Sequence, residues 1–420
     1  MRTTTWMPRA AAVLCAGVLL TGCSSTDAEP TAKSGGDATT PAVDLAALDT
    51  GSYPTSLAPE FARATKDNIV EVDGQRLAEF TVVPFEIDPE LTMAKMPTMV
   101  MRSGANLGVV ISNPAGEIAK NHNMLYGYVT TAATNTPKIT DPSRSVVHAV
   151  MRFKTPEDAA AAARDIHTEV TTVDDGAGIH KAETIDVLPN TLVSTRETSF
   201  QAGAEVSVNA LTPHGDYLIY TYAKAPAAQK DWTAQAVAKA LSLQGPLIDK
   251  FPATPTKEQN GGKPAELPMV DQDKILIYAI PEADAQAKLG DDLAVYGPRG
   301  MSHRSTNPPL TYRVLSETGA EHNAVAKTAV YRAKDDAGAQ RIVEEFTNDL
   351  TSQGYTPAPA PQGLSNATCV TKDTTNGTSD YCMVVKGRYV GEANGLDNKK
   401  DVDQQISAQY LILDKADQNA

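Results

Sequence analysis

An internal repeat is the feature of this sequence that most constrains its fold. Residues 149–154 read AVMRFK, and residues 329–334, 180 positions later, read AVYRAK. Each hexamer reads as a strand that leads into a helix, because an amphipathic helical pattern follows it in both places. A chain that contains the same strand–helix unit twice is expected to build two related domains.

The two helices that follow these hexamers carry matching apolar stripes. Both stripes follow the i, i+3, i+4, i+7, i+11 spacing of an amphipathic helix with one buried face. The first helix is preceded by Thr155 at the N-cap and starts with Pro156, a common first helical residue. The stripes consist of Ala159, Ala162, Ala163, Ile166 and Val170 in the first helix, and Ala339, Ile342, Val343, Phe346 and Leu350 in the second.

A second pair of helical patterns, at residues 231–243 and 401–413, repeats with an offset of 170 positions. Strand patterns lie between the two helices of each block, so each block reads strand, helix, antiparallel strands, helix. This order predicts an α+β fold in which each domain is an antiparallel-rich sheet with two main helices packed on one face. We expect an N-terminal domain at 58–251, a polar linker at 252–268 and a C-terminal domain at 269–416.

The N-terminus predicts export. Residues 1–22 contain Arg2 and Arg9, no acid, and an apolar run at 10–20 that is shorter than the roughly 20 residues a membrane-spanning helix needs. The run ends in the lipobox-like sequence LTGC, and only a cysteine offers the thiol that a diacylglycerol group requires. We therefore expect residues 1–22 to be a lipoprotein signal peptide and Cys23 to be lipidated. The alternative is an ordinary signal peptide with a chance cysteine.

The residues after this cysteine have the composition of a tether. Residues 23–57 start with a stretch rich in Ser, Thr, Ala, Pro and Gly, typical of a flexible segment that lifts a domain off a bilayer. Loss of residues 1–22 removes two positive charges and changes the formal net charge from −14 to −16. Such an acidic chain argues against nucleic acid as a partner. The expected location is the extracytoplasmic face of the cell membrane, reached through the lipid on Cys23.

Two further cysteines predict a disulfide. Cys369 and Cys382 flank the sequence TTNG at 374–377, and Asn-Gly is a strong hairpin signal. Two cysteines equidistant from such a turn can face each other across a strand pair, and an exported chain meets an oxidising compartment. A metal site is not expected, because two thiols without a paired histidine do not supply four ligands.

Several short motifs together suggest a family. These motifs are the lipobox, GSYPT at 51–55, YGPRG at 296–300 and AQY at 408–410. With them the chain resembles a two-domain family of envelope lipoproteins of unknown function from mycolate-forming actinobacteria. The resemblance implies an envelope location and an actinobacterial source, and it implies no known activity.

The sequence lacks the common catalytic motifs. It has no pair of histidines at helical i, i+4 spacing, no Ser-x-x-Lys, no Gly-x-Ser-x-Gly and no phosphate-binding Gly-x-x-x-x-Gly-Lys loop. We therefore expect no catalytic residue, no metal and no cofactor.

One loop is a candidate binding site. Tyr296, Arg299, His303 and Arg304 lie in or directly after the YGPRG motif, where a rigid Gly-Pro turn could present an arginine to an anionic group. The alternative is a plain turn with solvated basic residues.

These observations favour a non-catalytic binding or accessory module of the cell envelope. Its ligand, or an unknown envelope protein as partner, is expected at this loop or at the seam between the two domains. Two alternatives remain open. A lipid or glycolipid carrier needs a large apolar cavity, and an envelope hydrolase needs a nucleophile or a carboxylate pair in a cleft.

Overall fold

The structure is a computed structural model. It describes residues 43–419 except 139–140, 175, 177, 201–202, 282–288 and 291. The predicted signal peptide, Cys23 and the first part of the tether lie outside the described residues.

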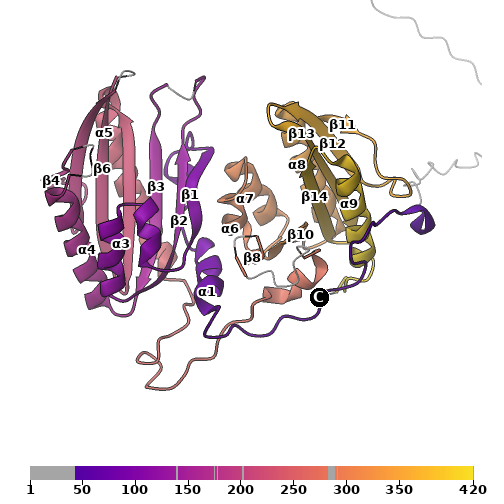
Figure 1. The fold of residues 1–420 in the computed structure, drawn as a ribbon, viewed down its shortest axis with the longest axis horizontal. Helices are drawn as coiled ribbons and strands as arrows, with labels where there is room; N and C mark the ends of the chain where they lie inside the picture. The colour runs from indigo at the N-terminus through magenta and orange to yellow at the C-terminus, as the bar shows by residue number, and fades with distance from the viewer. Residues whose placement is uncertain are drawn as a thin grey trace, which may run out of the picture. The chain divides into compact units, whose positions relative to one another are not determined.

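The described strands form two antiparallel sheets of seven strands each (Figure 1). The N-terminal sheet has the order β1-β2-β3-β7-β6-β5-β4, and the C-terminal sheet has the order β11-β12-β13-β14-β10-β9-β8. The strands of the first sheet are β1 (Met93–Met101), β2 (Met124–Ala133), β3 (Ser145–Phe153), β4 (Lys181–Glu183), β5 (Leu192–Phe200), β6 (Gly203–His214) and β7 (Tyr217–Pro226). Those of the second sheet are β8 (Ala294–Tyr296), β9 (Asn323–Val325), β10 (Ala329–Arg332), β11 (Thr356–Ala358), β12 (Thr368–Thr374), β13 (Gly377–Lys386) and β14 (Tyr389–Leu396).

Helices connect and cover the strands, which confirms the expected α+β class. The α-helices are α1 (Ile69–Ala78), α2 (Pro84–Ile87), α3 (Asn113–Asn121), α4 (Pro156–Thr172), α5 (Lys230–Ile248), α6 (Pro298–Ser302), α7 (Pro308–Glu317), α8 (Asp336–Ser352) and α9 (Lys399–Leu413). Short 3-10 helices are η1 (Leu45–Ala47), η2 (Gly104–Val109), η3 (Ala227–Gln229), η4 (Gln272–Lys274) and η5 (Leu276–Tyr278).

The two halves share one topology. Each half runs strand, short helix, helix, two strands, helix, four strands, helix, and corresponding strands occupy corresponding places in the two sheets. Helices α4 and α8 both have 17 residues, at the predicted offset of 180. The correspondence extends further than the sequence indicated, because η2 and α3 in the first half match α6 and α7 in the second.

A helix–helix contact is also repeated. The Oγ of Ser112, the N-cap of α3, donates to Oε2 of Glu169 on α4 at 3.1 Å. In the second half Nδ2 of Asn307, the N-cap of α7, donates to Oδ1 of Asp349 on α8 at 2.6 Å. Glu169 and Asp349 are themselves 180 positions apart, so both copies join the same two helices through the same pair of positions.

The two main helices of each half cover opposite faces of the sheet, which corrects the expectation of one covered face. In the N-terminal half α4 packs with Ala149 and Met151 of β3, whereas α5 packs in a separate cluster with Val146 of the same strand. Successive side chains of a strand point to opposite faces. Side chains on both faces of β3 are buried, so a helix packs on each face of the sheet at this strand.

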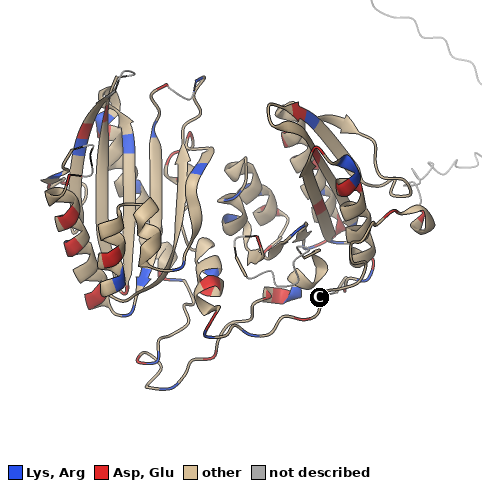
Figure 2. Ribbon diagram, viewed as in Figure 1, with Lys and Arg blue, Asp and Glu red and all other residues tan. Residues whose placement is uncertain are grey.

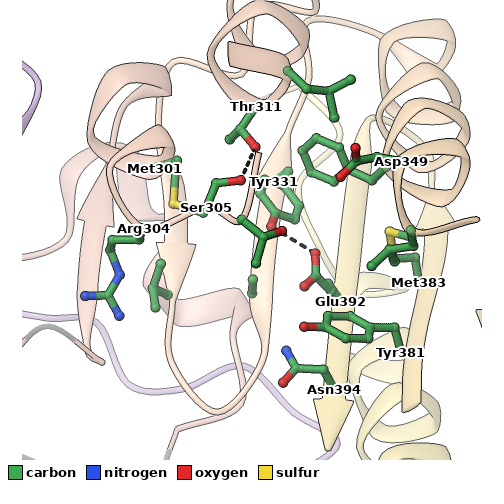
Figure 3. A pocket seen from close by; sticks show the side chains of 16 residues that line it. Met301, Arg304, Ser305, Thr311, Tyr331, Asp349, Tyr381, Met383, Glu392 and Asn394 are labelled. Carbon is green, nitrogen blue, oxygen red and sulfur yellow. Dashed lines mark hydrogen bonds between the residues drawn. The ribbon is translucent and has the colours of Figure 1, made fainter. Parts of the chain in front are cut away.

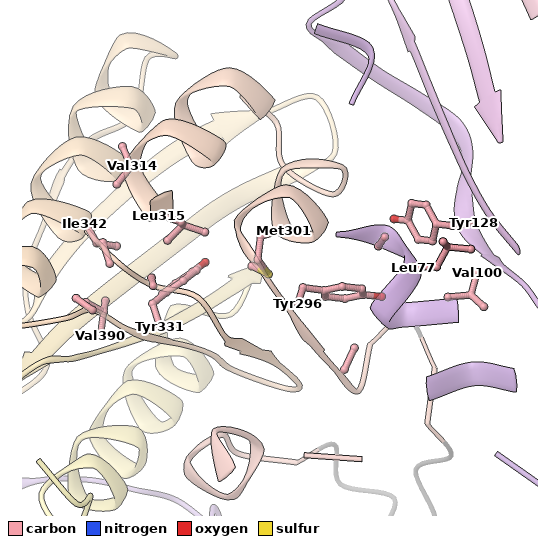
Figure 4. Close-up of a cluster of buried hydrophobic side chains, with 14 of the residues drawn as sticks. Leu77, Val100, Tyr128, Tyr296, Met301, Val314, Leu315, Tyr331, Ile342 and Val390 are labelled. Atoms are coloured by element: carbon pink, nitrogen blue, oxygen red, sulfur yellow. The ribbon is translucent and has the colours of Figure 1, made fainter. Parts of the chain in front are cut away.

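A shared core joins the two halves, which belong to one compact unit. Leu77 of α1 and Tyr128 of β2 lie in the same buried cluster as Tyr296 of β8 and Met301 of α6 (Figure 4). Nε2 of Gln75 on α1 also donates to the backbone oxygen of Gly290 at 2.9 Å. At this cluster the seam that was expected to offer a groove is therefore filled by packed side chains.

The predicted tether is too long. Residues 43–57 pack on the C-terminal half: the backbone N–H of Asp44 donates to the oxygen of Gly363 at 2.9 Å, and Tyr53 Oη donates to Asp401 at 2.6 Å. Val43 and Leu48 contact the core cluster beneath α9. These apolar residues gain more from burial than from solvation in a flexible segment, so a tether ends by residue 43.

The predicted disulfide is present. Cys369 and Cys382 are directly paired between β12 and β13, with Cα atoms 4.1 Å apart. The hairpin turn spans Thr374 to Gly377 as predicted, but Gly377 follows the two central residues and has a φ of 130°, a conformation that favours glycine. The N-terminal counterpart of this hairpin, β5–β6, has no cysteine pair.

Replacing Cys369 and Cys382 together by serine should lower the free energy of unfolding by about 3 kcal/mol, because the open chain gains conformational entropy on unfolding. Urea denaturation of the oxidised wild type and of the double variant measures the difference. The reduced wild type is the control and should match the variant. A loss below about 0.5 kcal/mol would contradict the prediction.

Candidate functional site

The predicted binding loop forms the joint between the two halves. Tyr296 ends β8 and is buried, and Arg299 lies in α6. The Nη2 of Arg299 donates to Oε1 of Glu86 at 2.9 Å, and its guanidinium lies 4.9 Å from the centre of the Tyr312 ring. The cation that was expected to bind an anionic ligand is thus neutralised by a carboxylate of the N-terminal half.

Gly297 of this loop packs closely against the side chain of Glu79 from the N-terminal half. A Cβ at Gly297 would lie 2.4 Å from Oε2 of Glu79. That oxygen accepts the backbone N–H of Gly300 at 2.9 Å. Burial raises the pKa of Glu79 to about 7, although the Gly300 N–H and Arg299 oppose the rise. The joint therefore contains a carboxyl group that takes up a proton near neutral pH.

His303 and Arg304 also act within the chain. His303 is fully enclosed: Nδ1 lies 3.0 Å from Thr130 Oγ1, and Nε2 lies 3.1 Å from the backbone oxygen of Ala78. Burial lowers its pKa to about 3, so the ring is neutral at physiological pH. Arg304 donates to Asp292 at 3.1 Å. The four predicted residues are close in sequence but do not converge on one cavity.

A pocket of about 270 Å³ lies in the C-terminal half (Figure 3). Strands β10, β13 and β14 form its floor, and helices α7 and α8 form its walls. Its lining includes Tyr331, Phe346, Tyr381 and Glu392. Several of these side chains point toward one another in Figure 3, and the pocket combines an apolar body with a few polar groups, as small-molecule sites do.

Glu392 is the central polar group of this pocket. Its Oε2 accepts a hydrogen bond from the Tyr331 hydroxyl at 2.9 Å. Burial raises the pKa of Glu392, and burial also raises the pKa of Tyr331 and brings that of Tyr381 to about 12. Among the described residues no basic side chain forms an ion pair with Glu392. A carboxyl group in this position is costly to ionise without a compensating charge.

Aromatic and apolar side chains surround the carboxyl group. The rings of Tyr331 and Phe346 are 5.6 Å apart and nearly perpendicular. Phe346 and Leu350, the last two residues of the predicted stripe on α8, line the pocket, whereas Ala339, Ile342 and Val343 are buried against the sheet. The stripe was predicted as one buried face, but its C-terminal end faces a cavity.

The N-terminal half has an equivalent pocket of about 220 Å³. Strand register defines the correspondence: Ala149 pairs with Tyr220 in the first sheet, and Ala329, 180 positions after Ala149, pairs with Glu392 in the second. Tyr220 lines the N-terminal pocket as Glu392 lines the C-terminal one. The duplication thus produced two pockets at the same place in the fold.

The two pockets differ in their polar groups. In the N-terminal pocket the Tyr220 hydroxyl donates to Oδ1 of Asn209 at 2.7 Å, and Nδ2 of Asn209 lies 2.9 Å from Nδ1 of His180. Asn209 corresponds by register to Tyr381. The N-terminal pocket therefore has a hydrogen-bonded chain of Tyr220, Asn209 and His180 where the C-terminal pocket has a carboxyl group.

Sequence analysis missed Tyr331, Tyr381 and Glu392. A signal was nevertheless present, because Tyr331 replaces Met151 within the repeated hexamer. A polar aromatic residue that replaces an apolar one in one copy of a repeat marks a position whose surroundings differ between the copies.

Two further features bear on metal binding and membrane contact. Cys369, Cys382 and Asp403 lie close enough to share an ion, but the two sulfur atoms form the disulfide and are not thiolate ligands. Within the part of the chain that the structure describes, every helix is too short or too polar to cross a membrane.

The fold and its paired pockets define a two-domain α+β protein that arose by duplication, with an equivalent small cavity in each half. The chain belongs to the DUF7373 family: residues 60–263 match the N-terminal part of this domain of unknown function, and residues 269–416 match the C-terminal part. This confirms the expected two-domain family of unknown function.

A solved structure is similar to part of the chain. Among solved structures the chain is similar to the crystal structure of the extracellular domain of PknH from Mycobacterium tuberculosis, with 11% sequence identity and a TM-score of 0.29. The match covers 45% of this chain and 100% of that one. No curated protein matches the chain.

Proposed function

We propose that this protein is a non-catalytic binding module of the actinobacterial cell envelope, held at the extracytoplasmic face of the membrane by lipid on Cys23. Its small-molecule ligand binds in the C-terminal pocket. The observation that carries the binding role is the partly buried carboxyl group of Glu392 among the aromatic rings of Tyr331, Phe346 and Tyr381. A polar contact to a ligand is stronger in such a partly desolvated position than in open water.

The lining of the pocket supports binding over catalysis. The described residues that line it include no histidine, cysteine or lysine to act as nucleophile or base. Its second carboxyl group, Asp349, accepts hydrogen bonds from Asn307 at 2.6 Å and Gln353 at 2.8 Å. Both carboxyl groups of the pocket thus have hydrogen-bond partners within the chain.

The size of the pocket favours a small ligand over a lipid. Its volume of about 270 Å³ is at or below the lower end of the roughly 300–1,000 Å³ range of small-molecule sites. A carrier of lipid or glycolipid needs space for complete acyl chains. The size of the pocket therefore supports a small-molecule binding module better than a carrier of lipid or glycolipid.

Charge distribution supports a partner other than nucleic acid. Figure 2 shows basic residues scattered among acidic ones over both halves. Nucleic acid binding requires a basic surface that neutralises several phosphates together.

Ligand-detected NMR with a fragment library tests the binding role. Asn394 lines the pocket, is exposed and hydrogen-bonds Glu392, so Asn394→Trp should block the opening and remove one partner of that carboxyl group. Asn348→Trp, on the exposed face of α8, is the matched control. Fragments should bind the wild type and the control but not Asn394→Trp. Binding that is the same in all three proteins, or no binding to any of them, would overturn the proposal.

Lipidation has its own test. Cys23→Ser should abolish acylation, because serine lacks the thiol that forms the thioether, and the protein should leave the membrane fraction. Mass spectrometry of the native protein should find lipid on Cys23 and no residues 1–22. Cys15→Ser, within the apolar run, is the control and should change neither result. A mature protein without lipid, starting at another residue, would contradict the prediction.

A further inference from the structure

We propose that the ligand of the C-terminal pocket is a small organic cation, an amine or quaternary ammonium group on an apolar body. This inference rests on the proposed function of the same pocket. Glu392 has no positively charged partner among the described residues, and aromatic side chains line the same pocket.

The charge of the pocket favours a cation. Glu392 accepts a hydrogen bond from the neutral Tyr331 hydroxyl, and no described basic side chain pairs with it. A buried carboxylate is stable when a positive charge lies near it. The described residues supply none at this position, so a cationic ligand would provide the missing charge.

The aromatic wall of the pocket also favours a cation. Tyr331, Phe346 and Tyr381 line the same cavity as the carboxyl group. The faces of aromatic rings attract cations, and quaternary ammonium groups are bound in proteins by such rings. A neutral apolar ligand would use these rings but leave Glu392 without a compensating positive charge. An anionic ligand would be repelled by it.

The basic residue Arg304 lies at the pocket but has other partners. Arg304 is the only described lining residue with a positive charge. Its guanidinium donates to Asp292 at 3.1 Å, lies 5.8 Å from the centre of the Tyr296 ring, and points away from Glu392 in Figure 3. It therefore does not fill the site that we assign to the cation.

The equivalent N-terminal pocket supplies an internal comparison. Tyr220 stands where Glu392 stands in the second half, and its hydroxyl is bonded to Asn209. The acid of that pocket, Glu169, accepts a hydrogen bond from Ser112. The cation site is thus a property of the C-terminal copy, acquired after duplication or lost from the other copy.

Cation binding should release a proton when it occurs on protonated Glu392. Burial raises the pKa of this carboxyl group, and a bound positive charge lowers it. The other titratable or charged groups that line the pocket are Tyr331 on β10, Tyr381 on β13, Asp349 on α8 and Arg304 after α6. The tyrosines have raised pKa values and stay neutral over the range in which a carboxyl group titrates.

A matched pair of probes tests the inference. 4-(Trimethylammonio)phenol and 4-tert-butylphenol have the same shape and differ in charge. We expect the wild type to bind the ammonium compound about tenfold more tightly or better, as measured by calorimetry. Glu392→Gln should abolish that preference. Glu344→Gln, which removes the same charge from the exposed face of α8, should retain it.

The outcomes separate this inference from the proposed function. If the neutral probe binds as tightly as the cation and Asn394→Trp blocks both, the cation inference is overturned and the binding role stands. If neither probe binds and the fragment library also fails, both are overturned. Calorimetry on the wild type in two buffers with different ionisation enthalpies detects proton release without any variant. Binding of the cation with no proton release at any pH between 5 and about 8 would also count against Glu392 as its partner.

Discussion

Arg152→Met should lower the free energy of unfolding by about 3–5 kcal/mol, because Arg152 is the centre of a buried polar network. Its side chain is 3% exposed. The guanidinium donates to the Tyr126 hydroxyl at 3.0 Å and to the backbone oxygen of Thr254 at 2.6 Å, and it forms an ion pair with Asp216 at 3.3 Å. Methionine fills a similar volume but leaves these acceptors without a donor.

The same network explains why the chain after α5 is fixed to the N-terminal half. Asp73 of α1 accepts hydrogen bonds from Tyr126 at 3.1 Å and from the Thr254 hydroxyl at 3.1 Å. The start of the segment predicted as a linker is thus bonded to α1 and, through Arg152, to β3. Loss of the arginine should loosen this segment first, which hydrogen exchange of residues near Thr254 would detect.

The duplication provides a matched control for this prediction. Arg332, 180 positions later, pairs with Asp273 at 3.2 Å, and that carboxylate is 55% exposed. Because water can replace an exposed partner, Arg332→Met should cost only about 1–2 kcal/mol. Chemical denaturation of both variants at neutral pH measures the difference. Equal losses of unfolding free energy in the two variants would mean that burial of the network around Arg152 adds nothing to the stability of the protein.

Leu77→Ala should destabilise both halves together, by about 3–5 kcal/mol. Leu77 is completely buried in the cluster that joins β2 of the first half to β8 and α6 of the second (Figure 4). Removal of its side chain leaves a cavity between two rigid sheets, which cannot collapse easily to fill it. Val187→Ala, at a site that is 57% exposed, is the control and should be neutral within about 0.5 kcal/mol.

Calorimetry distinguishes a shared core from two independent domains. We expect a single unfolding transition in the wild type and a single transition at lower temperature in Leu77→Ala. Two transitions, of which the substitution shifts only one, would contradict the prediction. That result would mean that the contacts of α1 with β8 do not couple the folding of the two halves.

Local sequence patterns predicted the parts of the fold that depend on local contacts. Helix α4 starts after Thr155 and α8 starts 180 residues after α4 because caps and apolar stripes act within one or two turns. The disulfide was predictable for the same reason, since its two cysteines belong to one hairpin. Hairpin register depends on a few neighbouring residues.

Long-range contacts account for what the sequence did not reveal. The tether was predicted from composition alone, and nothing near Asp44 indicates that Gly363 is its partner. The predicted loop around Arg299 contains binding-type residues, but only the fold shows that Glu86 neutralises the arginine. Likewise Tyr331 and Glu392 form the pocket through strand pairing over 61 residues, which no local pattern encodes.

The repeated contact between neighbouring helices has a consequence for how the two copies diverged. In the first half a short hydroxyl, Ser112, meets a long acid, Glu169, whereas in the second a longer amide, Asn307, meets a shorter acid, Asp349. The combined length of the two side chains is nearly the same in both halves, because one side chain is longer where the other is shorter. A change of either residue alone leaves a gap or a collision. The two pairs of residues therefore make the same contact between neighbouring helices in both halves, although the residues themselves differ.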